Sequence, residues 1–221
     1  NNPGMNGDLG IDGTSADALK INGSVTVKGD LVIGPGGDTN TVIDISANST
    51  VTGTQTAAVR ERNYYSLSTD VTSSGSLTVN GTETYTLAGG TYRFDSIKIT
   101  GSVNTTGPVV LYVDGKISIA GNGIATSGSA PPNLLIYSSG DDVSISGNAN
   151  IFGGIYAPNA KVSVSGNGGI YGGIVADQYD QSGNASIHFD EALKTHGGKG
   201  PNGVKLLAWQ EQNTASWGTG A

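Results

Sequence analysis

Three copies of the tripeptide Ser-Gly-Asn constrain the fold of this chain more than any other feature. They occupy residues 146–148, 165–167 and 182–184, so their glycines are 19 residues apart (147 to 166) and then 17 residues apart (166 to 183). A unit of this length is too short to bury a core of its own, whereas units of this length stacked on one another form a solenoid. We therefore expect the chain to wind rather than to form separate modules.

The residues before each tripeptide read as strands. In residues 143–146 and 162–165 apolar residues alternate with serine, which places one face of the strand in a core and the other in water. Glycine adopts positive φ without strain and asparagine tolerates it, so each Gly-Asn pair can turn the chain onto the next face. Stacked coils would align the asparagines, whose side-chain amides can then bond from coil to coil. The predicted corner ladder consists of Gly147, Asn148, Gly166, Asn167, Gly183 and Asn184.

Weaker copies of the strand-and-corner unit extend the pattern toward the N-terminus, at residues 25–33, 77–81, 97–101 and 116–122. Together they predict an all-β chain that forms a right-handed parallel β-helix with 17–19 residues per coil and about seven coils. The expected organisation is an extended N-terminal segment at 1–20, the β-solenoid at 21–191 and a C-terminal tail at 192–221. Within the solenoid we expect an insertion at about 54–83 and a loop at about 126–133.

Two segments depart from the coil pattern and have predicted packing roles. Residues 57–65 are the best short helix candidate and would cover the side of the rod. The tail contains an apolar stretch at 204–209, which ends in Trp209. Phe152, Tyr156 and Tyr171 are expected to form one outward-facing aromatic strip, and the apolar stretch would bury that strip.

Composition limits the class of partner. The net charge is −7 and basic residues form no stripe, which disfavours nucleic acid. The chain has no cysteine and therefore no disulfide or thiolate metal site. It contains no apolar run near 18 residues, so we expect no membrane span in this chain.

The strongest enzymatic interpretation rests on Asp141 and Asp142. Paired aspartates on a parallel β-helix serve as acid and base in polygalacturonase-type glycosidases. The companion motifs of that family are missing or out of order here, so we predict no enzyme activity and no catalytic residues. A β-helix that binds or cleaves polysaccharide remains the alternative.

Metal sites are weakly indicated. Asp8, Asp12 and Asp17 are 4 and 5 residues apart, whereas the first acidic ligands of a calcium loop are about 2 residues apart. They are the weak candidates for calcium, and otherwise we expect no metal and no cofactor. His188 lies in a strand pattern and His196 in a glycine-rich tail, and two histidines of this kind do not make a metal site, which favours ordinary surface positions.

The region from about 89 to 193 resembles the β-solenoid of PilX-like proteins, which are pilin-like components of bacterial type IV pili and related surface machinery. The residues that carry the resemblance are 107–115, 133–137, 154–160 (with Tyr156-Ala157-Pro158-Asn159), 188–193 and the ending 206–211. The coils are also similar, in a generic way, to those of bactofilins, which polymerise end to end. Pilin-like members begin with a long apolar helix, to which nothing in this sequence corresponds.

The resemblance implies a non-enzymatic structural or adhesive module of a pilus-like or filamentous assembly, at the cell surface or outside the cell. Its partners would be pilin-like subunits or copies of itself, with a polysaccharide as a further surface ligand. Open solenoid ends can pair with other chains. We therefore predict that residues 1–17 are donated to a neighbour. Ile11, Leu19 and Ile21 would be the anchors, and Phe152, Tyr156, Tyr171 and Trp209 are the other interaction candidates.

Overall fold

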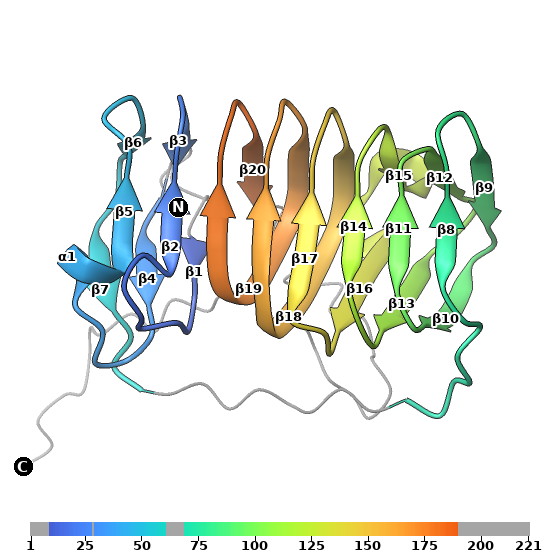
Figure 1. Ribbon diagram of the computed structural model, residues 1–221, viewed down its shortest axis with the longest axis horizontal. Helices are drawn as coiled ribbons and strands as arrows, with labels where there is room; N and C mark the ends of the chain where they lie inside the picture. Colours follow the sequence, from blue (N-terminus) through green and yellow to red (C-terminus); the bar gives the residue numbers. More distant parts are fainter. Residues whose placement is uncertain (1–8, 28, 61–68, 190–221) are drawn as a thin grey trace, which may run out of the picture.

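A computed structural model of the chain describes residues 9–27, 29–60 and 69–189, and it forms a parallel β-solenoid (Figure 1). The first strands and the short helix are β1 (Leu9–Gly10), β2 (Leu19–Ile21), β3 (Thr26–Val27), β4 (Leu31–Ile33), α1 (Thr39–Val42), β5 (Ile43–Ile45), β6 (Thr50–Val51) and β7 (Gln55–Ala57). The strands that follow are β8 (Leu77–Val79), β9 (Thr84–Leu87), β10 (Gly90–Phe94), β11 (Ile97–Ile99), β12 (Ser102–Thr105), β13 (Val109–Val113), β14 (Ile117–Ile119), β15 (Gly123–Ala125), β16 (Leu134–Ser138), β17 (Asp142–Ile145), β18 (Asn150–Val164), β19 (Gly169–Gln181) and β20 (Ser186–Phe189). The predicted class, an all-β parallel β-helix, is confirmed. The coils are longer and more numerous than predicted, since paired residues lie 20 apart at Ile97 and Ile117 and 26 apart at Ile117 and Val143, and one face contains eight strands.

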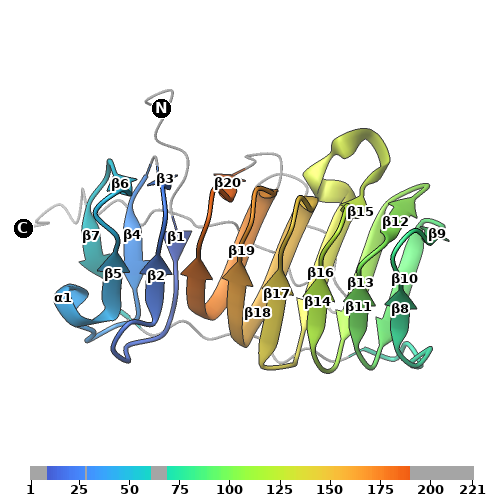
Figure 2. The same cartoon turned by 45° about the horizontal axis from the view of Figure 1, so that its top comes forward.

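Each turn of the solenoid contributes one strand to each of three faces. The serine face consists of eight strands, in the order β8, β11, β14, β17, the end of β18, the end of β19, β2 and β5. The tyrosine face contains β10, β13, β16, the middle of β18 and of β19, and then β1, β4 and β7. The ring-stack face contains β9, β12, β15, the starts of β18 and β19, and β20, with β3 and β6 at the same level of the N-terminal coils (Figure 2).

The core is a set of aliphatic ladders, because inward positions recur at the same register in every coil. On the serine face one such ladder runs through Leu77, Ile97, Ile117, Val143 and Val162. All five side chains are buried. Burying each one is worth about 1.5–3 kcal/mol, so a narrow rod gains its stability from many identical layers rather than from one large centre.

The coils do not stack in the order of the chain. Strand β19, near the end of the described residues, pairs in parallel with β2, near their beginning. The backbone N–H of Asn22 donates to the carbonyl oxygen of Gln181 at 2.7 Å, and that of Tyr179 donates to Ala18 at 2.9 Å. The first two coils therefore extend the rod beyond β19, and the connection 58–76 joins them to the first coil at the far end (Figure 1).

Two predicted boundaries and one predicted helix differ from the structure. Residues 9–20 do not belong to a separate extended segment, since β1 and β2 are strands of the solenoid. The insertion is shorter than the predicted 54–83, because β7 and β8 are coil strands; its described parts are residues 58–60 and 69–76. No helix begins at Ala57, which ends β7, and the rest of the predicted helix lies partly outside the described residues.

The predicted loop near 126–133 is confirmed. It consists of two 3₁₀ turns, Ser127–Ser129 and Pro131–Asn133, between β15 and β16. The predicted tail at 192–221 lies outside the described residues.

Candidate functional surfaces

The corner ladder lies where the sequence predicts it. Gly147, Gly166 and Gly183 all have positive φ, at 78°, 92° and 76°. The Nδ2 of Asn167 donates to Oδ1 of Asn148 at 3.5 Å, and the Nδ2 of Asn184 donates to Oδ1 of Asn167 at 3.2 Å. Gly23 continues the glycine column, since a Cβ at this position would collide with the carbonyl oxygen of Gly183. The repeat is thus a structural device that aligns the coils.

The serine face presents a flat row of short polar side chains. Its outward positions at one register are Thr78, Lys98, Ser118, Ser144, Ser163, Asp180, Lys20 and Asp44. Two ion pairs join neighbouring coils beside this row, Lys116 with Asp142 at 2.5 Å and Lys161 with Asp180 at 3.3 Å. The centre of the face is a grid of hydroxyl groups with charges at its rim.

The aspartate pair of the enzymatic alternative belongs to this face. Asp142 accepts from Lys116 Nζ, and Asp141 is exposed at the corner where its backbone oxygen accepts from the N–H of Lys161. The two carboxylates are therefore not a matched pair across a groove, because one of them already has a cationic partner.

The predicted aromatic strip is divided between two faces. Phe152 and Tyr171 lie on the ring-stack face, with ring centroids 4.6 Å apart and planes 12° apart. His188 continues the stack at 4.8 Å from Tyr171 and is exposed, as the sequence suggests for a surface histidine. Because the rings of Phe152, Tyr171 and His188 stack on one another, their inner faces are covered. A ligand could contact only the ring edges and the outer face of His188.

Tyr156 belongs instead to the tyrosine face. It has the same register as Tyr137, Tyr112 and Arg93 on the preceding coils. Tyr112 and Tyr137 stack at 5.2 Å, and Tyr137 meets Tyr156 edge to face at 5.9 Å. The expectation of one continuous strip through Phe152, Tyr156 and Tyr171 is wrong, because strand alternation and the Gly153-Gly154 corner separate Phe152 from Tyr156. Sequence reasoning missed Tyr112 and Tyr137, although both stand at alternate positions in β13 and β16.

Burial changes the acidity of these phenols. Desolvation, helped by the neighbouring Tyr137, raises the pKa of Tyr112 to about 12, and desolvation also raises the pKa of Tyr137. In the core, burial raises the pKa of Tyr179 well above its ordinary value. Its hydroxyl donates to Oε1 of Gln181 at 2.9 Å, which satisfies both polar groups inside the rod.

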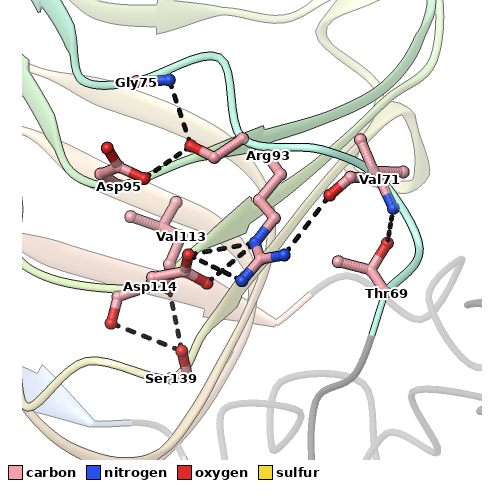
Figure 3. A network of polar contacts seen from close by, with 9 residues as sticks. Thr69, Val71, Gly75, Arg93, Asp95, Val113, Asp114 and Ser139 are labelled. Carbon is pink, nitrogen blue, oxygen red and sulfur yellow. Dashed lines mark hydrogen bonds and ion pairs between the residues drawn. The ribbon is translucent and has the colours of Figure 1, made fainter.

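A shallow hollow of about 270 Å³ lies at the edge of the tyrosine face, between Thr69, Arg93, Tyr112, Asp114 and Tyr137. Figure 3 shows that its charged groups are already engaged. Both Nε and Nη2 of Arg93 lie 3.0 Å from Oδ2 of Asp114, and Nη1 donates to the carbonyl oxygen of Val71 at 3.5 Å. Arg93 thus joins the connection at Val71 to the coil at Asp114, and its charge is paired with a carboxylate rather than available to a substrate.

The same connection closes the end of the rod at β10. The N–H of Ser74 donates to the carbonyl oxygen of Arg93, and the N–H of Asp95 donates to Gly75, both at 2.9 Å. In this coil the inward register positions hold aromatic residues, Tyr85 beside Val103 and Tyr92 beside Leu111. Tyr92 packs against the core, whereas Tyr85 is 44% exposed. We name this end, where residues 74 and 75 bond to Arg93 and Asp95, the plugged end.

At the opposite end, formed by β5, β6 and β7, the short helix α1 packs beside β5 and β7 and buries Val42. We name this end the open end. Its inward side chains Ile43, Ile45, Val51 and Ala57 are half-buried. In the described part of the chain each of these strands pairs on one side only. The backbone N–H groups of Thr50 and Thr52 donate to the carbonyl oxygens of Val25 and Val27 on the neighbouring coil. The N–H of Val51 between them therefore points away from that coil, toward the end of the rod.

The predicted N-terminal anchors are buried in their own chain. Ile11, Leu19 and Ile21 are all 0% exposed and belong to the core of the rod. They cannot anchor a neighbour in this state, so that prediction is wrong.

The calcium candidates do not assemble in the described residues. Asp17 has φ of 57° and its carboxylate lies 3.1 Å from Nζ of Lys20, and Asp12 is half-buried. The described ranges contain no group of three or more histidine and acidic side chains that could hold a metal ion. Asp8, His196 and Trp209 lie outside the described residues.

Comparison with known proteins gives the fold more support than the function. No curated protein matches the chain. A solved structure described as an ice-binding protein from an Antarctic biological consortium superposes with a TM-score of 0.51, over 84% of this chain and 89% of the other, at 14% identity. At this identity the likeness concerns the fold alone. None of the helices in the described ranges is long and apolar enough to cross a membrane. Residues 40–196 match the profile of a domain of unknown function, and the chain therefore belongs to the family DUF7305.

Proposed function

We propose that this protein is a non-enzymatic structural module of a pilus-like or filamentous assembly outside the cell. The open end carries the proposal. It combines half-buried aliphatic side chains with strand edges that pair on one side only in the described residues. Such edges template pairing with another chain. At the plugged end β8 and β9 also pair on one side only in the described residues, but residues 74 and 75 hydrogen-bond to Arg93 and Asp95 there. Assembly through the open end would join two copies or a copy and a pilin-like subunit.

The test compares variants at the two ends by light scattering and negative-stain microscopy over a range of protein concentrations. We expect the unmodified chain to give dimers or longer rods. Ile45→Lys should reduce them to monomers because a charge would be buried at the joint. Thr78→Lys, on the coil at the plugged end, is the matched control and should assemble normally. Since Ile45→Lys also touches the core, Val51→Pro provides a second variant that removes an outward-pointing N–H.

A monomer at every concentration would contradict self-assembly, as would assembly that both open-end variants retain. Addition of a pilin-like subunit then separates attachment to a different fibre from self-assembly. Surface localisation is tested separately by labelling intact cells with an antibody, where labelling that requires permeabilised cells would contradict an extracellular role.

A second candidate is binding of a regular surface or polymer through the serine face. The hydroxyl row of Ser118, Ser144 and Ser163 repeats at the spacing of successive strands, about 4.8 Å. A repetitive ligand, such as a polysaccharide or the ice named for the structural neighbour, would match such a repeat. In the same preparation, retention on polysaccharide or on ice that Ser144→Tyr abolishes would favour this candidate. Retention by neither would exclude it for these ligands.

A further inference from the structure

Four large side chains stand on the outside of the tyrosine face and yet are shielded from water. Tyr112, Leu135, Tyr137 and Tyr156 form a cluster separate from the core, with Val110 and Val175 packed against it. Strand alternation gives their direction, since Leu111 and Ile136, the neighbours of Tyr112 and Tyr137 along the strands, belong to the core. The exposed fraction is 2% for Tyr137 and 7% for Tyr156.

Outward side chains of a sheet become this inaccessible only when another layer covers them. Leu135, directly between two core residues in β16, is 4% exposed. The hydroxyl of Tyr137 is buried and has no hydrogen-bond partner among the described residues. An exposed sheet face would leave this oxygen in water, so its burial also indicates a covering layer.

The described parts of the connection 58–76 do not provide that layer. Val59 is 88% exposed, so this part of the connection does not pack on a face. Thr69 reaches only the rim of the cluster, where it lines the hollow beside Tyr112 and Tyr137. The 3₁₀ turn Pro131–Asn133 packs mainly against β18.

The chain continues beyond β20 for residues 190–221, and this stretch has the composition of a cover. Residues 204–209 read Val-Lys-Leu-Leu-Ala-Trp, the most apolar stretch after β20. Both tryptophans of the chain, Trp209 and Trp217, lie in this segment. Exposed, such a stretch would be an aggregation-prone strand, whereas a flat aromatic face is a complementary surface for it.

We infer that the C-terminal segment packs across the tyrosine face of its own chain through residues 204–209, with Trp209 against the tyrosine cluster. The segment forms an outer layer that runs along the coils of β13, β16 and β18 and fastens them to one another. This role is independent of assembly through the open end, because the open end lies at β5, β6 and β7.

Trp209 serves as its own reporter in the full chain that carries Trp217→Phe. We expect blue-shifted emission and several-fold weaker acrylamide quenching than in the urea-denatured chain, both independent of protein concentration. Leu135→Asp, which places a charge in the cluster, should shift the emission to the red. Ser144→Asp, at an outward position of the serine face, is the matched control and should leave it unchanged. A red-shifted, freely quenched Trp209 in the folded parent, or protection that appears only at high concentration, would overturn the inference.

A truncation after Lys199 keeps the inference testable if Leu135→Asp does not fold. In a spectroscopic pH titration of the full chain, Tyr112 and Tyr137 should ionise at higher pH than an ordinary tyrosine. After truncation we expect both to ionise near the ordinary pKa of about 10. Tyr179, buried inside the coils, should remain late and so report that the rod is intact. If the truncated chain keeps the same number of late tyrosines, something other than the C-terminal segment covers the face and the inference is wrong.

Discussion

At the scale of single residues, Gly166 is required for two separate reasons. Its φ of 92° disfavours any side chain, and a Cβ there would collide with the carbonyl oxygen of Gly147 on the coil below. Gly128, in the loop between β15 and β16, has φ of 69°, but a Cβ there would meet nothing within 4 Å.

The two glycines therefore separate backbone strain from contact between coils. We expect Gly128→Ala to lower the free energy of unfolding by about 1 kcal/mol, from the φ strain alone. Gly166→Ala should cost about 3 kcal/mol, since the methyl group also pushes two coils apart. Urea denaturation measures both, and equal losses at the two positions would contradict the stacked-corner explanation.

At the scale of strands, the tyrosine face makes stability depend on pH in the alkaline range. Tyr112 has a pKa of about 12 in the folded chain, against about 10 in an unfolded one. Because the folded state holds the proton more tightly, this contribution is complete below pH 10 and is lost as the pH rises to 12. We expect the melting temperature to fall over this range and Tyr112→Phe to reduce the fall. Tyr85→Phe, at a residue 44% exposed, is the control and should leave the fall unchanged; equal behaviour of both variants would contradict the assignment.

Strand-level features were predictable from the sequence where they depend on local alternation. The strands β14, β17 and the end of β18, together with the asparagine ladder, follow from apolar residues at every second position before a Gly-Asn corner. The division of Phe152 and Tyr156 between two faces was not predictable in the same way. It depends on how Gly153 and Gly154 bend a single long strand, β18, around a corner. The burial of the tyrosine cluster was not predictable either, because alternation places Tyr112 and Tyr137 on the outer side of the sheet.

At the scale of the whole molecule, the order of the coils could not be predicted from the sequence. The strand edges of different coils are alike, so the repeat pattern does not specify which coils are neighbours. The structure joins β19 to β2, so the rod is continuous in space where the chain is not. A chain that begins at Thr69, runs to residue 221, and continues through a flexible linker into residues 1–60 would wind almost in spatial order.

This circular permutant should keep the circular dichroism and melting temperature of the natural order. It should refold faster, because fewer of its contacts join residues distant in sequence. A permutant opened between Gly147 and Asn148 is the control, and it should be less stable because its new ends break the corner ladder. An unfolded first permutant would contradict the observed coil order.

The position of β2 against β19 also bears on synthesis. A ribosome completes Leu19, Ile21 and the rest of the first two coils before any residue of β19 exists. These coils therefore emerge with one apolar cross-section uncovered, and they acquire their neighbour only when nearly the whole solenoid has been translated. During that interval an adjacent chain whose own first coils have not yet docked presents a β19 edge of the same register. On crowded polysomes the first two coils of one chain can therefore stack on the β19 edge of a neighbouring chain. Exchange of these coils between chains would begin in this way.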